Sequence, residues 1–162
     1  MRTIHALSSG GGDAIHWQYA MFVQRVQSVW FVLSVDEARG LIRLRRTAHR
    51  ITTEAELVTS FEQLTAELGQ IVAVADRGRY GLLQDMRDAP LLDKPELEAV
   101  QLRCLEPIRH GWRRGAVLVR TPIGKLQARR MTNKSQSGSA TAASTAIFDD
   151  ELEALNFLCA TS

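Results

Sequence analysis

Residues 82–98, LLQDMRDAPLLDKPELE, contain the pattern that decides the fold: a short apolar run, an acidic turn and the start of a helix. A short apolar run that ends in turn residues predicts a buried strand. Asp93 and Glu96 have the spacing of a helix-capping pair, and Pro95 falls in the first helical turn, where its missing N–H costs little. A strand followed directly by a helix is the unit of α/β proteins, which bind ligands beyond the carboxyl ends of their strands.

Two β-rich runs precede this unit. VWFVLSV (29–35) and LIRLRRTA (41–48) flank the turn DEARG, which predicts an antiparallel hairpin. TTEAELVTSFEQLTAEL (52–68) then opens on a capping box of Thr53 and Glu56 and continues with apolar residues at helical spacing. The apolar stripe of this helix, which we expect to face the sheet, consists of Leu57, Phe61, Leu64 and Leu68.

The rest of the chain continues the alternation of strand and helix. A helix from Asp93 carries apolar residues on one face, GAVLVR (115–120) reads as a strand buried on both faces, and Thr121 starts a third helix. TAIFD (145–149) predicts the last strand, and Asp149 is expected to cap the last helix. The predicted fold is therefore α/β, in the order ββαβαβαβα: a mixed sheet with an antiparallel first hairpin, then parallel strands joined by right-handed crossovers, and helices packed on it.

Length and composition describe one ordinary globular domain. The 162 residues are 45% hydrophobic and 23% charged, and the net charge of +2 gives no reason to expect a nucleic-acid partner. No apolar run approaches the roughly 18 residues of a membrane span, and the N-terminus lacks a signal-like apolar core. Cys104 and Cys159 have no paired spacing, so we expect reduced cysteines in a cytoplasmic protein.

Residues 1–28 are expected to form an N-terminal extension before a single domain of residues 29–162. Residues 14–27 fit a helix and a strand about equally, with a slight preference for a helix. The segment is dense in apolar and aromatic side chains of the types enriched at binding hot spots, so we expect self-association into a homodimer through residues 14–30. Its candidate partner-binding residues are Trp17, Tyr19 and Phe22.

From residue 29 to about residue 160, the strand order and two motifs resemble the SpoIIAA-like branch of STAS domains (sulphate transporter and anti-sigma factor antagonist). The motifs are DMRDAP (85–90) and FDDELEAL (148–155). The resemblance implies a mixed sheet with helices packed on it, a bacterial source and a role in binding a protein partner.

The chain departs from that family where its phosphorylation switch is expected. A Ser or Thr normally opens the helix after the corresponding strand, but residues 85–98 contain no Ser, Thr or Tyr. The phosphorylation switch is therefore not carried over. The acids Asp88 and Asp93 remain as candidate partner-binding residues of this turn.

Two other readings of the acidic turn are weaker. Asp85, Asp88 and Asp93 are oxygen ligands of the kind that Mg²⁺ takes. A phosphoaspartate receiver also needs an earlier acid pair, where this chain has RTAHR (46–50), and a Lys at the end of the next strand, which here ends in Phe148-Asp149. We expect no metal site, and expect Asp85 to tie the turn together with Arg87 or Asp88.

The basic residues allow one further site. Thr121, Gly124 and Lys125 lie at a predicted helix N-terminus after a strand, where free N–H groups favour an anion. Arg43 and Arg45 share one face of their strand, which we expect to be solvated; the alternative is an anionic-partner patch formed with the third helix. Metal-spaced histidines, a GxSxG motif, a P-loop and a GxGxxG motif do not occur.

These observations favour a non-catalytic regulatory or scaffold module that acts by protein–protein interaction, without a cofactor. The alternative is a small-molecule or lipid-binding domain, since similar sheets in the CRAL-TRIO class hold apolar ligands. A lipid cavity is expected to need extra helices as a roof, and only the first 28 residues are left over to supply them.

Overall fold

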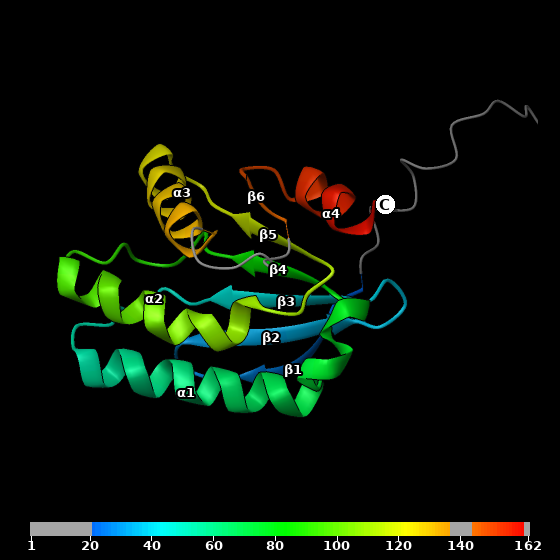
Figure 1. Ribbon diagram of the computed structural model, residues 1–162, viewed down its shortest axis with the longest axis horizontal. Helices are drawn as coiled ribbons and strands as arrows, with labels where there is room; N and C mark the ends of the chain where they lie inside the picture. Colours follow the sequence, from blue (N-terminus) through cyan, green and yellow to red (C-terminus); the bar gives the residue numbers. More distant parts are fainter. Residues whose placement is uncertain (1–20, 137–143, 161–162) are drawn as a thin grey trace, which may run out of the picture.

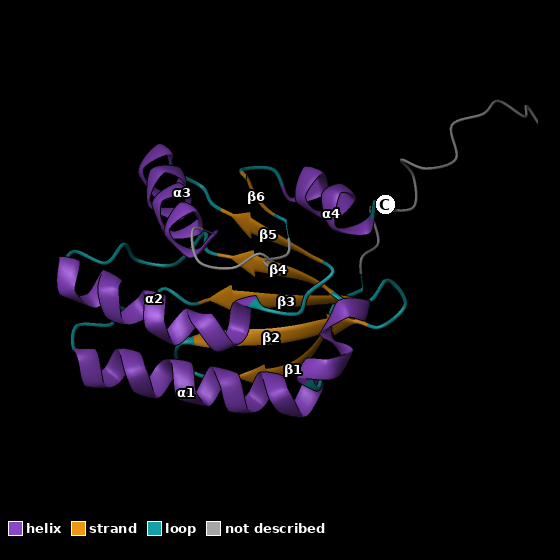
Figure 2. Cartoon of the chain, viewed as in Figure 1, coloured by secondary structure: helices purple, strands orange, loops and turns teal. Residues whose placement is uncertain are grey.

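The computed structural model describes residues 21–136 and 144–160, which form one six-stranded sheet with helices on both faces (Figures 1 and 2). The strands are β1 (Val23–Gln27), β2 (Phe31–Asp36), β3 (Leu41–Arg46), β4 (Gly81–Asp85), β5 (Arg114–Leu118) and β6 (Thr145–Phe148). The helices are α1 (Glu54–Ile71), the 3₁₀ helix η2 (Val74–Arg79), α2 (Pro95–Arg109), α3 (Pro122–Gln136) and α4 (Glu151–Cys159).

The sheet has the predicted mixed topology. Its strands lie in chain order from β1 to β6; β1, β2 and β3 are antiparallel neighbours, and β3 to β6 are parallel. Three successive crossovers in the same direction place α1, α2 and α3 on one face, because such crossovers are right-handed. The chain then turns after β6, and α4 packs on the opposite face (Figure 1).

The strand β1 was not part of the predicted order, and the slight preference for a helix was wrong over its length. Val23 to Gln27 pair antiparallel with β2, with a register irregularity between Gln24 and Val26. They therefore belong to the sheet rather than to an extension before it. Residues 14–20 lie outside the described part of the chain.

Two apolar clusters cover the two faces of the sheet. The predicted stripe of α1 is buried, with Phe61 4% exposed and Leu68 fully buried, and it packs with α2 against Ile42 and Leu82. On the other face, α4 packs on a second set that alternates with the first along the strands: Leu41, Leu83, Ala116 and Leu118. Because β5 is buried on both faces, it reads as a continuous apolar run, as predicted.

The helix caps differ in detail from the prediction. Thr53 does cap α1, since its hydroxyl accepts a hydrogen bond from the Glu56 N–H. Asp93 does not cap α2, which starts after Lys94 without a side-chain cap. Asp150, rather than Asp149, caps α4 by accepting from the Glu153 N–H at 2.9 Å. The spacing of apolar residues therefore predicted the helices correctly, but two of the predicted N-caps are wrong by one residue, which is the usual uncertainty of helix ends.

A buried arginine fixes the far end of α2. Arg77 of η2 is 2% exposed and donates to the carbonyl oxygens of Pro107 and His110, at 2.7 and 3.3 Å. Its guanidinium also lies over the Trp112 ring. Gly111, with φ of +88°, supplies the left-handed turn that ends the helix. A cation at carbonyls left free by a helix C-terminus is stabilising, so α2 has a fixed position on the sheet.

Candidate functional site

The turn after β4 sends its side chains to both faces of the sheet. Asp85 and Arg87 join a charged cluster on the α4 face, whereas Met86, Ala89 and Pro90 line a pocket on the α1–α3 face. The turn identified in the sequence therefore contributes side chains to two separate sites, the charged cluster on one face of the sheet and the pocket on the other.

The charged cluster is centred on Asp85, which is 1% exposed. Arg43 and Arg87 both donate to its carboxylate, with the Arg87 contacts at 2.8 and 2.9 Å, and both also pair with Glu151 of α4. Burial alone would raise the pKa of Asp85, but the hydrogen bonds from Arg87 and Arg43 outweigh it and lower the pKa to about 2. Two arginines and two carboxylates balance in charge, so the cluster ties β3, β4 and α4 together.

This cluster corrects the predicted face of Arg43. The sequence suggested a solvated face shared by Arg43 and Arg45, but α4 covers part of it and Arg43 is half-buried against Asp85. Arg45 is exposed, as expected. The expected tie between Asp85 and Arg87 is confirmed.

The three acids considered for Mg²⁺ pair with different arginines. Asp85 has the partners just described, Asp88 pairs with Arg120 at 3.3 Å, and Asp93 pairs with Arg50 at 3.5 Å. Among residues 21–136 and 144–160, no three His, Cys, Asp or Glu side chains are grouped so as to hold a metal ion.

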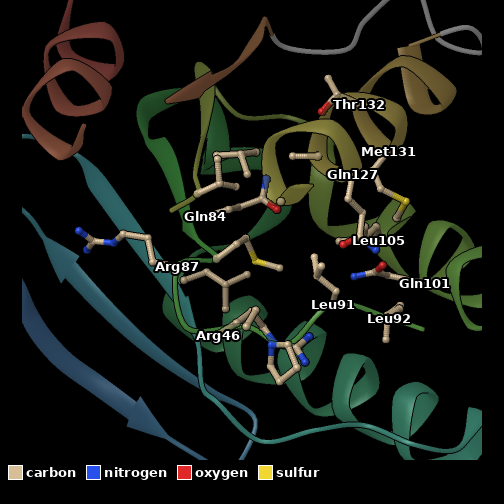
Figure 3. Close-up of a pocket in the computed structure, with 18 of the residues that line it drawn as sticks. Arg46, Gln84, Arg87, Leu91, Leu92, Gln101, Leu105, Gln127, Met131 and Thr132 are labelled. Atoms are coloured by element: carbon tan, nitrogen blue, oxygen red, sulfur yellow. The ribbon is translucent and has the colours of Figure 1, made fainter. Parts of the chain in front are cut away.

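The pocket lies between α2 and α3, above the carboxyl-terminal halves of β4 and β5, and has a volume of about 260 Å³ (Figure 3). Its floor follows the sheet register, in which Leu44 is paired with Gln84 and Gln84 with Val117. α3 is inclined to α2 (Figure 1). The walls come from the turn after β4 and from the helices: Met86, Leu91, Leu92, Leu105, Ala128 and Met131.

A few polar side chains interrupt this apolar lining. Gln84, Gln101 and Gln127 reach it from β4, α2 and α3 (Figure 3). Arg46 and Arg109 also line it, and burial lowers the pKa of each guanidinium from its ordinary value. Arg87 contributes to the wall, but its guanidinium points away from the pocket (Figure 3). A mostly apolar concave site with a few polar groups is the common form of a small-molecule site.

Of the three residues predicted to form an anion-binding site, two line the pocket and the third, Lys125, does not. Thr121 and Gly124 line the pocket, where the Thr121 hydroxyl accepts a hydrogen bond from the Gly124 N–H at 3.0 Å. Lys125 pairs instead with Asp149 at 3.1 Å, and its hydrogen bond lowers the pKa of that carboxyl. The lysine charge is thus directed to the start of α4 rather than to the pocket.

The predicted partner-binding residues are dispersed. Trp17 and Tyr19 lie outside the described residues. Phe22 packs on the α4-side cluster, with the Arg43 guanidinium over its ring at 5.7 Å. Asp88 and Asp93 lie in the turn between β4 and α2, each paired with a surface arginine.

Sequence reasoning missed the pocket and Arg46. One signal was present: Arg46 is two and four residues after Leu44 and Ile42, so strand alternation places it on the apolar face. Gln84, inside an otherwise apolar strand, was a second signal. The spacing between α2 and α3, which creates the cavity, has no counterpart in sequence periodicity.

Comparisons of the chain with models of protein families, with curated proteins and with solved structures found no significant match. Within the described residues, the helices are too short or too polar to cross a membrane.

Proposed function

We propose that this protein is a non-catalytic binding module whose pocket between α2 and α3 takes a small, largely apolar ligand. The observation that carries the proposal is the cavity of about 260 Å³ over the row Leu44, Gln84 and Val117, at the carboxyl end of the parallel strands. Open α/β sheets bind ligands at this end. The cavity is walled by α2 and α3 themselves, so the roof of extra helices expected for a lipid site is not required.

A regulatory role fits this proposal, because occupation of the pocket would act on the turn after β4. Met86, Ala89 and Pro90 line the pocket, while Asp88 and Asp93 of the same turn are exposed to a partner. Membership of the SpoIIAA-like STAS domains stays a proposal as well, supported by the mixed sheet and the order of elements from β2 to α4.

The test is to fill the pocket without touching the rest of the molecule. Ala128 lines the cavity and is half-buried, so Ala128→Phe places a ring in the space. Leu126, two residues earlier on α3, is 61% exposed, so Leu126→Phe adds the same ring outside. Nile red, an uncharged apolar dye, should bind the wild type and Leu126→Phe alike and bind Ala128→Phe about tenfold more weakly, a loss of about 1.4 kcal/mol. Equal fluorescence titrations of all three proteins would refute the pocket as the binding site.

A second candidate function, interaction with a protein chain, is favoured by the edge strand β1. Met21 and Val23 are 76% and 52% exposed, and β1 has a described neighbour, β2, on one side only. An open strand edge with exposed apolar groups is a template for pairing with another chain. The simplest partner is a second copy of this chain, joined through residues 14–30 in a twofold dimer.

A further inference from the structure

Arg46 brings a positive charge to an apolar face. It ends β3 on the same side as Ile42 and Leu44, because side chains alternate along a strand. Its guanidinium lies over the Phe61 ring, with 5.9 Å to the ring centre, and it lines the pocket between α2 and α3. The arginine therefore stands beside the cavity rather than on the solvated side of the sheet.

No carboxylate balances this charge. In the stretches 21–136 and 144–160, no Asp or Glu oxygen lies within 4 Å of the Arg46 guanidinium, and its buried Nε has no hydrogen-bond partner. Burial lowers the pKa of Arg46, but an arginine stays protonated at neutral pH. A desolvated cation without an anionic partner is unfavourable, and an anion placed beside it would recover part of that cost.

The other arginines around the pocket are differently placed. Arg87 is paired with Asp85 and Glu151, and Arg120 with Asp88. Arg109 donates to the Met131 carbonyl oxygen at 3.2 Å, which satisfies one of its N–H groups within the wall. Arg109, like Arg46, has no carboxylate in an ion pair among the described residues, but its guanidinium is held by that carbonyl, so Arg46 is the cation of the pocket lining that is available to an anion.

The floor of the pocket contains a second polar group. Gln84 lies between Leu44 and Val117 in the sheet register, and its side-chain amide lines the pocket (Figure 3). The rest of the lining is mostly apolar, with further polar side chains such as Gln101 and Gln127 on the helices. A ligand that satisfies this surface has an apolar body and one polar end.

We propose that the pocket binds a small amphiphile with an apolar body and a single anionic head group, a carboxylate or a phosphate, which pairs with Arg46. This inference rests on the binding function proposed above. The planar guanidinium fits either head group, since both offer two oxygens to its parallel N–H groups. The apolar body lies between α2 and α3, against the apolar wall residues Leu105, Ala128 and Met131.

Matched ligands test the head group separately from the apolar body. Octanoate and 1-octanol share one carbon chain and differ in the carboxylate, and octyl phosphate carries the other anion. By titration calorimetry at neutral pH, the wild type should bind at least one of the two anions about tenfold or more tightly than 1-octanol. The anion that binds more tightly identifies the head group, and a preference for either supports the inference.

Matched variants then assign the preference to one residue. Arg46→Met keeps the apolar stem and removes the charge, so it should bind the anions no better than 1-octanol and leave the 1-octanol dissociation constant within about twofold of the wild type. Unchanged binding of 1-octanol also shows that the variant is folded. Arg46→Lys should keep part of the preference, and Arg45→Met, which removes the neighbouring arginine on the exposed face of the same strand, should keep all of it.

The outcomes separate the two proposals. If 1-octanol and Nile red bind but the anions have no advantage, or if Arg46→Met keeps the advantage, the inference about the head group is wrong and the binding function stands. If neither Nile red nor any of the three eight-carbon probes binds, both proposals fail.

Discussion

The Asp85 cluster allows a quantitative prediction about stability in acid. In the folded protein the pKa of Asp85 is about 2, against an ordinary value of 3.8. Multiplied by about 1.36 kcal/mol for each pKa unit, this difference corresponds to roughly 2.5 kcal/mol of folding free energy. Because Asp85 is 1% exposed, solvent screening reduces this value little.

The sign follows from the direction of the shift. The folded state holds the carboxylate in its charged form more strongly than the unfolded state does, so the contribution is present in full above a pH of about 4. It is lost as the pH falls from about 4 to about 2, where the folded state must also bind the proton.

Asp85→Asn removes the charge at every pH and leaves Arg43 and Arg87 with Glu151 alone. Breaking one side of a buried ion pair costs about 3–5 kcal/mol, so the variant should be less stable than the wild type by about 3 kcal/mol at a pH of about 6. Urea melts at a series of pH values should show this difference shrinking by about 2 kcal/mol as the pH falls to about 2.

Asp88→Asn is the matched control, since Asp88 is partly exposed and pairs with Arg120 at the surface. Its cost should stay below about 1 kcal/mol at every pH. Parallel stability curves for the wild type and Asp85→Asn would show that the arginines do not hold Asp85 in its charged form, and would refute the reasoning.

Two further predictions concern the core and the N-terminal segment. Phe61→Ala should lower the free energy of unfolding by about 3–5 kcal/mol in urea melts, whereas Leu126→Ala on the exposed face of α3 should cost less than about 0.5 kcal/mol; similar costs would contradict the assigned faces. In sedimentation, the full chain should form a dimer, and a chain that starts at Ser28, which lacks both the apolar segment and β1, should be monomeric. A dimer formed by both would place the interface elsewhere.

The sequence predicted those parts of the fold in which the spacing of apolar residues fits only a helix or only a strand. The stripe of α1 through Leu57 and Leu64 is buried as expected, and the continuous apolar run of β5 is covered on both faces. β1 was harder, because Val26 fits a helical spacing with Phe22 whereas Val23 alternates with Met21 as in a strand, and only pairing with β2 selects the strand. Tertiary hydrogen bonds outside the segment thus decided its structure.

The site was less predictable than the fold, because it depends on which residue meets which across the sheet. Asp85 was expected to tie its own turn together, and it does so through Arg87. Its other partner, Arg43, is 42 positions away and is brought to it by the strand register, while Glu151 of α4 joins the cluster through the same two arginines. Periodicity assigns a face to such residues, but it does not say which element covers that face.

The cavity is consistent with the polar residues at its centre. Gln84 lies on a face whose neighbours in the register are Leu44 and Val117, and close packing of α2 and α3 over it would bury an amide without a partner. Gln101 and Gln127 place amides on the inner sides of those same helices. Close contact between the helices would remove all three amides from water, which costs free energy. Separation of α2 from α3 avoids this cost. The same polar residues that weaken the packing of α2 on α3 would supply hydrogen-bonding groups to a ligand in the proposed site.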